Sequence, residues 1–262
     1  MERQHNYAFV AIGVTGVALN ALEMIMIMKG GQYRVPFQIS VLSLSVADLL
    51  ACLSVAFCSA LVLILNLPYP YPEMLINAYM RTIIFSSISS QLHVIFITIQ
   101  RLMAVLLPFS CKRILTPVRC SLLLALIWII SSAVTGLTKD SYYIIAFILV
   151  TGVVIAFSYA FIVYRIRNRP VVITRDSSAG SDVTLYSGML FLLFVVCFFP
   201  YVILYIIYGT EMGHNGPWIA VYYLYWLNTV TNPIVYFLFK SIKGGAKCLK
   251  SNRTTNCIQG AC

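Results

Sequence analysis

Seven long stretches of apolar residues, almost free of charge, dominate this sequence and restrict what it can fold into. A run of about twenty apolar residues is long enough for a helix to cross the hydrocarbon core of a bilayer. The chain is 60% apolar and only 10% charged, whereas a typical soluble domain carries roughly 25% charged residues. This balance argues against a water-soluble fold, and also against intrinsic disorder, which requires low hydrophobicity and high charge.

The continuity of the runs favours helices over a membrane barrel, whose strands alternate polar and apolar residues over about ten positions. We therefore predict an all-α membrane protein, a seven-transmembrane helix bundle with a short amphipathic eighth helix. The predicted spans are residues 7–28, 37–67, 80–107, 118–137, 142–164, 185–208 and 218–239. Residues 1–6 would form an extracellular N-terminus, 7–239 the transmembrane domain, and 240–262 the amphipathic helix and cytoplasmic tail.

Basic residues predict the orientation of the bundle, because Lys and Arg favour cytoplasmic loops. They concentrate on one side of a seven-span arrangement, at Lys29, Arg34, Lys112, Arg113, Arg119, Arg165, Arg167, Arg169, Arg175, Lys240, Lys243, Lys247, Lys250 and Arg253. The other side has only Arg3, Arg81 and Lys139. This asymmetry predicts a multi-pass membrane protein with its N-terminus outside, and it assigns the net charge of +10 to a membrane face rather than to nucleic-acid binding.

Asp48 is the ionisable residue predicted to lie deepest in a span, which makes it a functional-site hypothesis. Its candidate partners at similar depth are Asn20, Ser90, Asn228, Thr229 and Asn232. These groups could join the helices by hydrogen bonds, or they could hold Na⁺ against the carboxylate. Glu23 lies nearer the cytoplasmic end of its span, and we expect it to snorkel to the interface.

Two spans contain a proline, Pro200 in the sixth and Pro233 in the seventh. An internal proline removes one helical hydrogen bond and kinks the helix. Prolines are also commoner in membrane helices than in soluble ones. Beside a polar cluster, however, two kinked helices suggest segments that can pivot.

Six short motifs occur in a familiar order along the spans. They are Asn20 in the first, Ser45-Val46-Ala47-Asp48 in the second, Gln100-Arg101-Leu102 at the end of the third, Trp128 in the fourth, Cys197-Phe198-Phe199-Pro200-Tyr201 in the sixth and Asn232-Pro233-Ile234-Val235-Tyr236 in the seventh. Over nearly its whole length the chain thus resembles the class A (rhodopsin-like) G-protein-coupled receptors. It departs from them at Gln100, where the family has an acid, at Leu102 for tyrosine, and at Phe198 for tryptophan. Ile76 stands at the usual cysteine position, so no outer disulfide is expected.

The resemblance implies a non-enzymatic receptor that transmits an extracellular small-molecule or short-peptide signal to heterotrimeric G proteins. The implied coupling and activation residues are Arg101, Gln100, Tyr159, Phe198, Pro200, Asn232, Pro233 and Tyr236. Gln100 can hydrogen-bond Arg101 but cannot neutralise it, so we expect a weakly locked inactive state with raised basal signalling; Asp182 is a candidate substitute. No cofactor is implied except Na⁺ as an allosteric ion, held by Asp48, Ser90, Asn228 and Asn232.

The implied ligand pocket is aromatic and mostly uncharged. Its lining is predicted to be Ile83, Ile84, Ser87, Tyr143, Tyr201, Tyr205, Trp218, Tyr222 and Trp226. Ile83 stands where amine receptors of the family place an aspartate, and Trp226 stands where opsins place the retinal-linking lysine, so a simple amine and a Schiff base are both disfavoured. The amphipathic stretch after Tyr236 would contact lipids of the inner leaflet, with Cys248 as a palmitoylation site.

Three other functions can be set against this interpretation. A receptor-like chain that no longer couples to G proteins would fit Gln100 and Leu102. A small-molecule transporter would show internal repeats and paired broken helices, and we find neither in the sequence. The histidines His5, His93 and His214 are scattered, so they indicate neither a metal cluster nor a catalytic pair.

Overall fold

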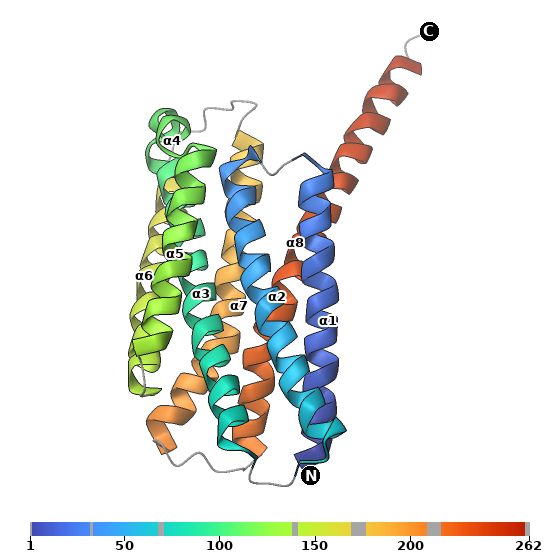
Figure 1. Cartoon of the computed structure of the whole chain (residues 1–262). Coiled ribbons are helices and arrows are strands. Elements are labelled where there is room, and N and C mark those ends of the chain that lie inside the picture. Colours follow the sequence, from blue (N-terminus) through green and yellow to red (C-terminus); the bar gives the residue numbers. More distant parts are fainter. Residues whose placement is uncertain are drawn as a thin grey trace.

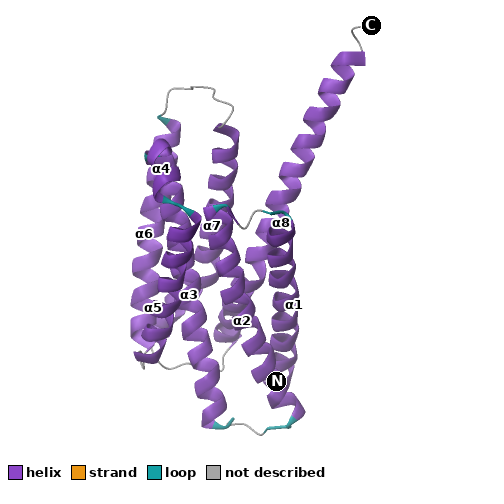
Figure 2. Cartoon of the chain, turned by 45° about the horizontal axis from the view of Figure 1, so that its top comes forward, coloured by secondary structure: helices purple, strands orange, loops and turns teal. Residues whose placement is uncertain are grey.

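The computed structural model describes residues 2–31, 34–67, 71–137, 141–168, 177–208 and 216–259. Across these ranges all regular secondary structure is helical. The elements are α1 (Glu2–Lys29), α2 (Pro36–Ile64), α3 (Glu73–Leu106), α4 (Pro108–Ile114), α5 (Pro117–Leu137), α6 (Ser141–Arg167), α7 (Ser177–Tyr208) and α8 (Gly216–Gln259). The long helices run side by side as one bundle, and the short α4 lies at one end of it (Figures 1 and 2).

The seven-helix fold class is confirmed by this arrangement. The helices α1, α2, α3, α5, α6 and α7 each contain a segment that is long and apolar enough to cross a membrane. The seventh bundle helix is the first part of α8, which packs against α1, α2 and α7. This part is less apolar than the others because Asn228, Thr229, Thr231 and Asn232 lie in its middle.

Most helices extend beyond the apolar runs that predicted them. The helix α1 begins at Glu2, α3 at Glu73 and α7 at Ser177, in each case several residues before the predicted span. Backbone hydrogen bonding continues past the point where the side chains become polar, whereas an apolar run marks only the part in hydrocarbon. The helix α3 thus continues for seven residues before the predicted third span, and Met74 in its first turn is 87% exposed.

The separate amphipathic helix predicted after Tyr236 is not confirmed. The backbone of α8 continues from Gly216 to Gln259 as one helix, passing through Pro233, and its end projects away from the bundle (Figure 1). No proline follows Pro233 in the sequence, and Gly244-Gly245 does not interrupt the helix. The sequence therefore lacks a strong stop signal at the membrane boundary.

The outside of the bundle is apolar. Large hydrophobic side chains such as Phe57, Ile64, Leu122, Ile129 and Phe157 are each more than half exposed. An apolar exterior of this extent suits lipid as solvent, with the backbone groups satisfied inside each helix. The α1 helix begins at one end of the bundle and α8 finishes at the other, as an odd number of crossings requires (Figure 1).

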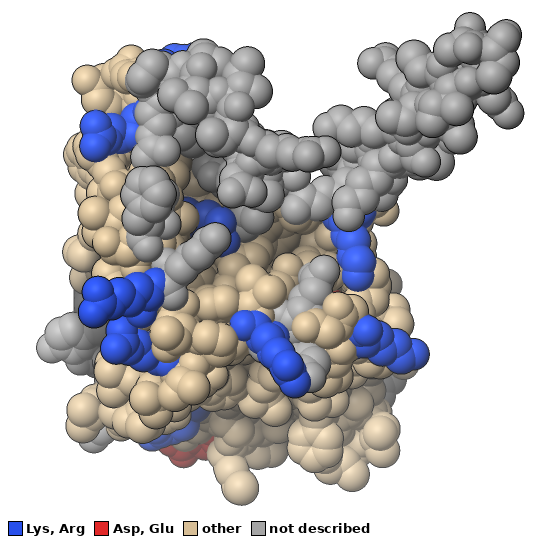
Figure 3. Space-filling view, turned by 90° about the horizontal axis from the view of Figure 1, so that it is seen from above, with Lys and Arg blue, Asp and Glu red and all other residues tan. Residues whose placement is uncertain are grey.

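Basic side chains gather on the end of the bundle opposite the start of α1. Figure 3 looks onto this end, where the described Lys and Arg side chains are spread over the face and a described acidic side chain is visible only at its edge. Lys29 ends α1, Arg34 precedes α2, and Arg165 and Arg167 lie in the last turn of α6. The predicted charge asymmetry is therefore a feature of the three-dimensional structure, and this end is called the basic face below.

Helix α3 lies at the centre of the bundle, packing against α2, α5, α6 and α7. Trp128 of α5 donates from Nε1 to Ser43 Oγ of α2 at 3.0 Å, and the same hydroxyl lies 2.8 Å from His93 Nε2 of α3. His93 is fully buried, and its Nδ1 lies 2.7 Å from the Ser89 carbonyl oxygen. These contacts join three helices, and they show that His93 belongs to a structural network.

Candidate functional site

The Asp48 carboxylate lies fully buried at the meeting point of α2, α3 and α8. The Ser90 hydroxyl donates to Oδ1 at 2.9 Å, and the Asn232 amide donates to Oδ2 at 2.7 Å. The structure thus brings together two of the predicted partners of this carboxylate. Asn228 is also buried nearby on α8, and its backbone carbonyl accepts a bond from Thr231. Each carboxylate oxygen has its own donor from a different helix, which joins the three helices through one acid.

Asn20 and Thr229, the other two candidate partners, contact each other. Pro233 has no N–H group, so the helix leaves the carbonyl of Thr229 without its usual donor. The amide of Asn20 fills this place, donating to the Thr229 carbonyl at 3.0 Å and to that of Gly16 at 2.8 Å. The proline in α8 and the asparagine in α1 therefore form one structural unit, in which a polar side chain satisfies a freed backbone group.

Glu23 is the main correction to the prediction of polar residues. It does not reach the interface: its side chain is only 1% exposed, and the Ser45 hydroxyl donates to its Oε2 at 2.9 Å. The rotation of α1 about its own axis explains this burial. Glu23 lies three residues after Asn20, so it shares the face of α1 that points toward α2 and α8. A second buried carboxylate thus lies close to Asp48.

Arg101 lies near the end of α3 at the basic face, with its guanidinium over the ring of Phe37 at 4.2 Å from the centroid. Among the residues that the structure describes, no carboxylate is within ion-pair distance of it. The hydrogen bond expected from Gln100 is not found, because the Gln100 amide donates to Ser40 Oγ at 2.9 Å and lies 3.6 Å from Cys120 Sγ. Arg101 is therefore held by a cation–π contact, a weaker restraint than a buried ion pair.

The short helix α4 also lies near this guanidinium. Partial burial raises the pKa of the Cys111 thiol in α4, and the positive charge of Arg101 opposes that rise. Arg101 thus has Phe37 of α2 and α4 as neighbours. A movement of α2 or α4 relative to α3 would therefore change the contacts of the Arg101 guanidinium.

Aromatic rings pack beside Arg101 at the end of the bundle that carries the basic face, which is called the inner end below. Tyr186 of α7 makes an edge-on contact with Phe37 at 5.6 Å and with Tyr236 of α8 at 6.2 Å, and it lies 5.4 Å from Phe239. We call these four residues the inner aromatic cluster. It connects α2, α7 and α8, so it is broken if α7 moves outward. Tyr159 of α6 stacks instead on Phe191 of α7 at 5.4 Å.

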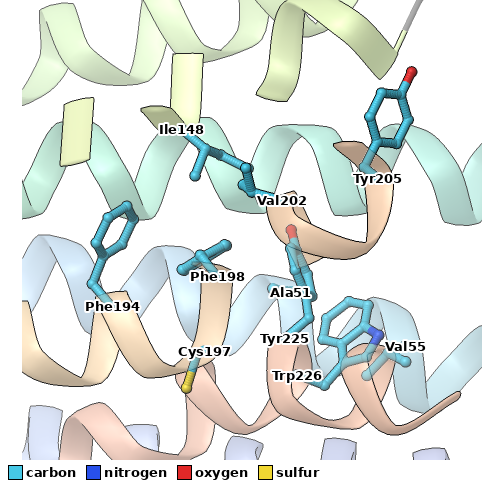
Figure 4. Close-up of a cluster of buried hydrophobic side chains, with 10 residues drawn as sticks. All are labelled: Ala51, Val55, Ile148, Phe194, Cys197, Phe198, Val202, Tyr205, Tyr225 and Trp226. Atoms are coloured by element: carbon cyan, nitrogen blue, oxygen red, sulfur yellow. The ribbon is translucent and has the colours of Figure 1, made fainter. Parts of the chain in front are cut away.

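A second set of aromatic rings, the outer aromatic cluster, fills the other half of the bundle around Phe198, Tyr205, Tyr225 and Trp226 (Figure 4). Ile83, Ile84 and Tyr201 pack against it, and Tyr222 lies half-buried on the same helix as Trp226. The structure thus brings together the predicted pocket residues of α3, α7 and α8. They are tightly packed, since Trp226 is fully buried and Ser87 is 1% exposed.

Two residues of the outer aromatic cluster region were missed by sequence reasoning. Tyr225 hydrogen-bonds Ser87 and donates to the Ile83 carbonyl at 2.6 Å. Tyr79 accepts from Trp226 Nε1 at 3.0 Å. The available signal was the run of tyrosines in residues 222–225, in which two residues three apart share one helix face. Tyr79 gave none, because it precedes the predicted span.

Some predicted residues lie outside what the structure describes. The side chains of Tyr143, Asp182, Trp218 and Cys248 belong to this group, as do the whole residues Lys139, Arg169 and Arg175. Their expected roles stay predictions. Pro200, by contrast, lies inside α7 as expected, next to the buried Phe198.

The described helices form a seven-helix bundle with an apolar exterior, a buried acid at its centre and an arginine over an aromatic ring near the basic face, an arrangement that fits a multi-pass membrane protein. Residues 19–139 match the family model described as 7 transmembrane receptor (rhodopsin family). The matched part includes Asn20, Asp48, Arg101 and Trp128, and it supports a class A G-protein-coupled receptor, as the motifs predicted. Among curated proteins, none matches the chain at a significant level.

Proposed function

We propose that this chain transmits an extracellular signal, carried by a small molecule or a short peptide, to heterotrimeric G proteins at the plasma membrane. Its N-terminus would be outside, and the basic face would lie in the cytoplasm. The main observation in support is the position of Arg101 at the inner end of α3, over a single aromatic ring. A cation–π contact contributes only about 0.5–2 kcal/mol. A G protein that offers hydrogen-bond acceptors to Arg101 could therefore draw its guanidinium away from Phe37 at a small cost in free energy.

The ring contacts of the inner aromatic cluster would hold the bundle in a closed, inactive state. Outward movement of α7 would separate Tyr186 from Phe37 and Tyr236, and would open a path to Arg101. Pro200 and Pro233 lie inside the two helices that would have to bend. A ligand that packs better against the open arrangement of the outer aromatic cluster would shift the population toward it.

We expect Gln100→Asp to lower ligand-free signalling. A carboxylate next to Arg101 could pair with the guanidinium, and a charge-assisted bond is roughly twice as strong as a neutral one. If the pair adds about 1 kcal/mol to the closed state, basal nucleotide exchange falls about fivefold. The measurement is exchange on added G protein without ligand, in membranes containing equal amounts of each receptor.

The matched control for this prediction is Gln100→Asn, which shortens the side chain in the same way without adding charge. It should leave basal exchange much nearer to that of the parent. An unchanged or higher baseline in Gln100→Asp, with the control also unchanged, would show that the missing acid does not weaken the closed state.

The chemistry of the outer aromatic cluster favours an uncharged or amphipathic ligand. Pockets for small molecules are mostly apolar, with a few placed polar groups, and here the polar groups are the hydroxyls of Tyr201, Tyr205, Tyr222 and Ser87. Ile83 provides no acid for an amine, and Trp226 provides no amine for a Schiff base. Inner-leaflet lipids would contact the basic residues after Tyr236, with Cys248 as the lipidation site.

Sodium is the allosteric ion that we propose for the Asp48 centre, with Ser90, Asn228 and Asn232 as the other oxygen ligands. Replacing choline by sodium at constant ionic strength should then lower ligand-free exchange, and Asp48→Asn should abolish the response. The physical reason is that an amide keeps the shape of the side chain but removes the charge that attracts the ion. Equal responses of parent and variant to sodium would contradict this role of Asp48.

The second candidate function is a receptor-like chain that folds but no longer couples. It is favoured by Gln100, which contacts Ser40 and Cys120 rather than Arg101, and by Leu102. Nucleotide exchange on a panel of G proteins separates the two, since only a coupling receptor would accelerate it. A transporter, which is less well supported, would be revealed by substrate flux in liposomes.

A further inference from the structure

Two free cysteines lie on neighbouring helices at the inner end of the bundle. Cys111 is in the second half of α4 and is partly buried, whereas Cys120 is in the first turn of α5 and is fully buried. Only residues 115 and 116 separate the two helices. Both cysteines belong to one apolar cluster with Leu115 and Leu124, and the two thiols are close enough to interact electrostatically.

Arg119 holds the end of α4 against the beginning of α5. Its Nη1 atom donates to the carbonyl oxygens of Arg113 at 3.3 Å and of Ile114 at 3.4 Å. These carbonyls belong to the last turn of α4, where the helix itself supplies no donor. The backbone N–H of Arg119 also donates to the Thr116 hydroxyl at 3.4 Å. The two cysteine-bearing helices thus form one packed unit.

Each thiol also has a polar neighbour from α3. The Gln100 amide donates to Cys120 Sγ at 3.6 Å, and the positive charge of Arg101 acts on Cys111. Partial burial raises the pKa of the Cys111 thiol, and Arg101 opposes that rise. The thiolate is the nucleophile in thiol chemistry. Cys111, which is partly exposed and next to a cation, is therefore the thiol that a dissolved oxidant reaches first, with the enclosed Cys120 beside it.

We infer that Cys111 and Cys120 form a reversible disulfide when a hydroperoxide, such as hydrogen peroxide, oxidises the chain. The Cys111 thiolate attacks one peroxide oxygen, the O–O bond breaks, and the leaving hydroxide takes up the proton that Cys111 released. Cys111 is then a sulfenic acid. The Cys120 thiol attacks its sulfur, the S–O bond breaks, and the oxygen leaves as water with the thiol proton. The two thiols lose two electrons, and the peroxide gains them.

The position of this bond also has a consequence for signalling, and that consequence rests on the proposed function. The disulfide would connect α4 directly to α5, and both helices pack against α3, which carries Gln100 and Arg101. With α4 unable to move by itself, the Arg101 guanidinium would leave Phe37 for a G protein less readily. In the cytoplasm, where the proposed orientation puts the basic face, thiol pools reduce disulfides, so the bond would be transient and regulatory.

The test is oxidation of the purified full chain by hydrogen peroxide in lipid nanodiscs, followed by alkylation of free thiols, digestion and mass spectrometry. Trypsin cleaves after Arg113 and Arg119 and so separates the two cysteines. In the parent, their peptides should be recovered as one disulfide-linked pair, which dithiothreitol converts back to free thiols. Cys58, a partly buried free thiol of α2, should stay reduced under the same conditions.

Cys120→Ser should abolish the linked pair and leave Cys111 as a sulfenic acid, which a dimedone probe labels. If Cys120→Ser does not fold, Cys111→Ser changes a partly exposed position and should also abolish the pair. Cys58→Ser is the matched control and should form the pair as the parent does. Arg101→Gln should slow its formation by about threefold, because less Cys111 is ionised without the positive charge, although the remaining thiolate is more nucleophilic.

A peroxide-treated parent without the linked pair would overturn the inference, and so would oxidation of Cys58 as fast as that of Cys111. For signalling, oxidation should lower ligand-free exchange on G protein by at least about fivefold in the parent, and it should leave Cys111→Ser unchanged. Equal exchange by the oxidised and reduced parent would refute the regulatory consequence. A chain that accelerates no exchange in either state would refute the proposed function, while the linked pair would still establish the disulfide.

Discussion

Arg101→Ala is expected to reduce nucleotide exchange on G protein by about 30-fold, both without ligand and with it. The guanidinium is the charged group at the inner end of α3, and its cation–π contact with Phe37 at 4.2 Å is weak enough to be exchanged for a partner. Removing a central arginine from a protein interface typically costs 2 kcal/mol or more, which corresponds to about that factor. The measurement is exchange in membranes with equal amounts of receptor.

The control for this prediction is Arg113→Ala, in α4 on the basic face, where the side chain is exposed. A single exposed charge should change exchange only slightly. Phe37→Leu should act in the opposite direction and raise basal exchange, because it removes the ring beneath Arg101 and the edge-on contact of Tyr186. If Arg101→Ala and the parent gave equal nucleotide exchange on G protein, the result would favour the second candidate function, a receptor-like chain that does not couple.

Gly13→Leu is expected to prevent accumulation of the folded receptor. The helices α1 and α2 approach so closely that a Cβ atom at Gly13 would lie 2.8 Å from Ala56 Cβ and 2.8 Å from the Cys52 carbonyl oxygen. Two of its three nearest atoms are backbone atoms of α2, so side-chain rotation cannot relieve the overlap. Overpacking usually costs about 1–3 kcal/mol, occasionally more, and here the whole interface must separate.

The matched control is Gly136→Leu in α5, where an added Cβ would meet nothing within 4 Å. This exposed position should accept leucine, which also has a higher helix propensity than glycine. Yield of monodisperse protein in detergent and Tm in nanodiscs provide the comparison. Equal stability of the two variants would mean that α1 and α2 can move apart without loss of the fold.

Much of the fold could be predicted because long apolar runs have one main structural solution in a bilayer. The spans starting at residues 37, 118 and 142 begin within a residue of α2, α5 and α6. Helix ends were less well predicted, as at Ser177 in α7, because polar residues continue a helix without leaving an apolar signal. The separate amphipathic helix predicted after Tyr236 was not confirmed. No proline or other stop signal follows Tyr236, and these residues continue α8 as one helix.

The polar centre was predictable only in part. Depth in the spans correctly paired Asp48 with Ser90 and Asn232, because groups at equal depth meet across a narrow bundle. Depth could not reveal that Glu23 points inward, since this depends on the rotation of α1 about its own axis. It also could not show that Gln100 contacts Ser40 rather than Arg101.

The sequence by itself determined that the bilayer is the solvent of the helices, how many times the chain crosses it, which end carries the basic face, and that Asp48 lies at the centre. These follow from composition and periodicity, which act locally along the chain and need no neighbour. Only the tertiary structure decided which oxygen each donor reaches, which ring lies beneath Arg101, and that α1 carries a second buried acid. Those features depend on how each helix is rotated and how closely it packs, and a rotation of about one residue, or about 100°, moves a side chain from the interior to lipid.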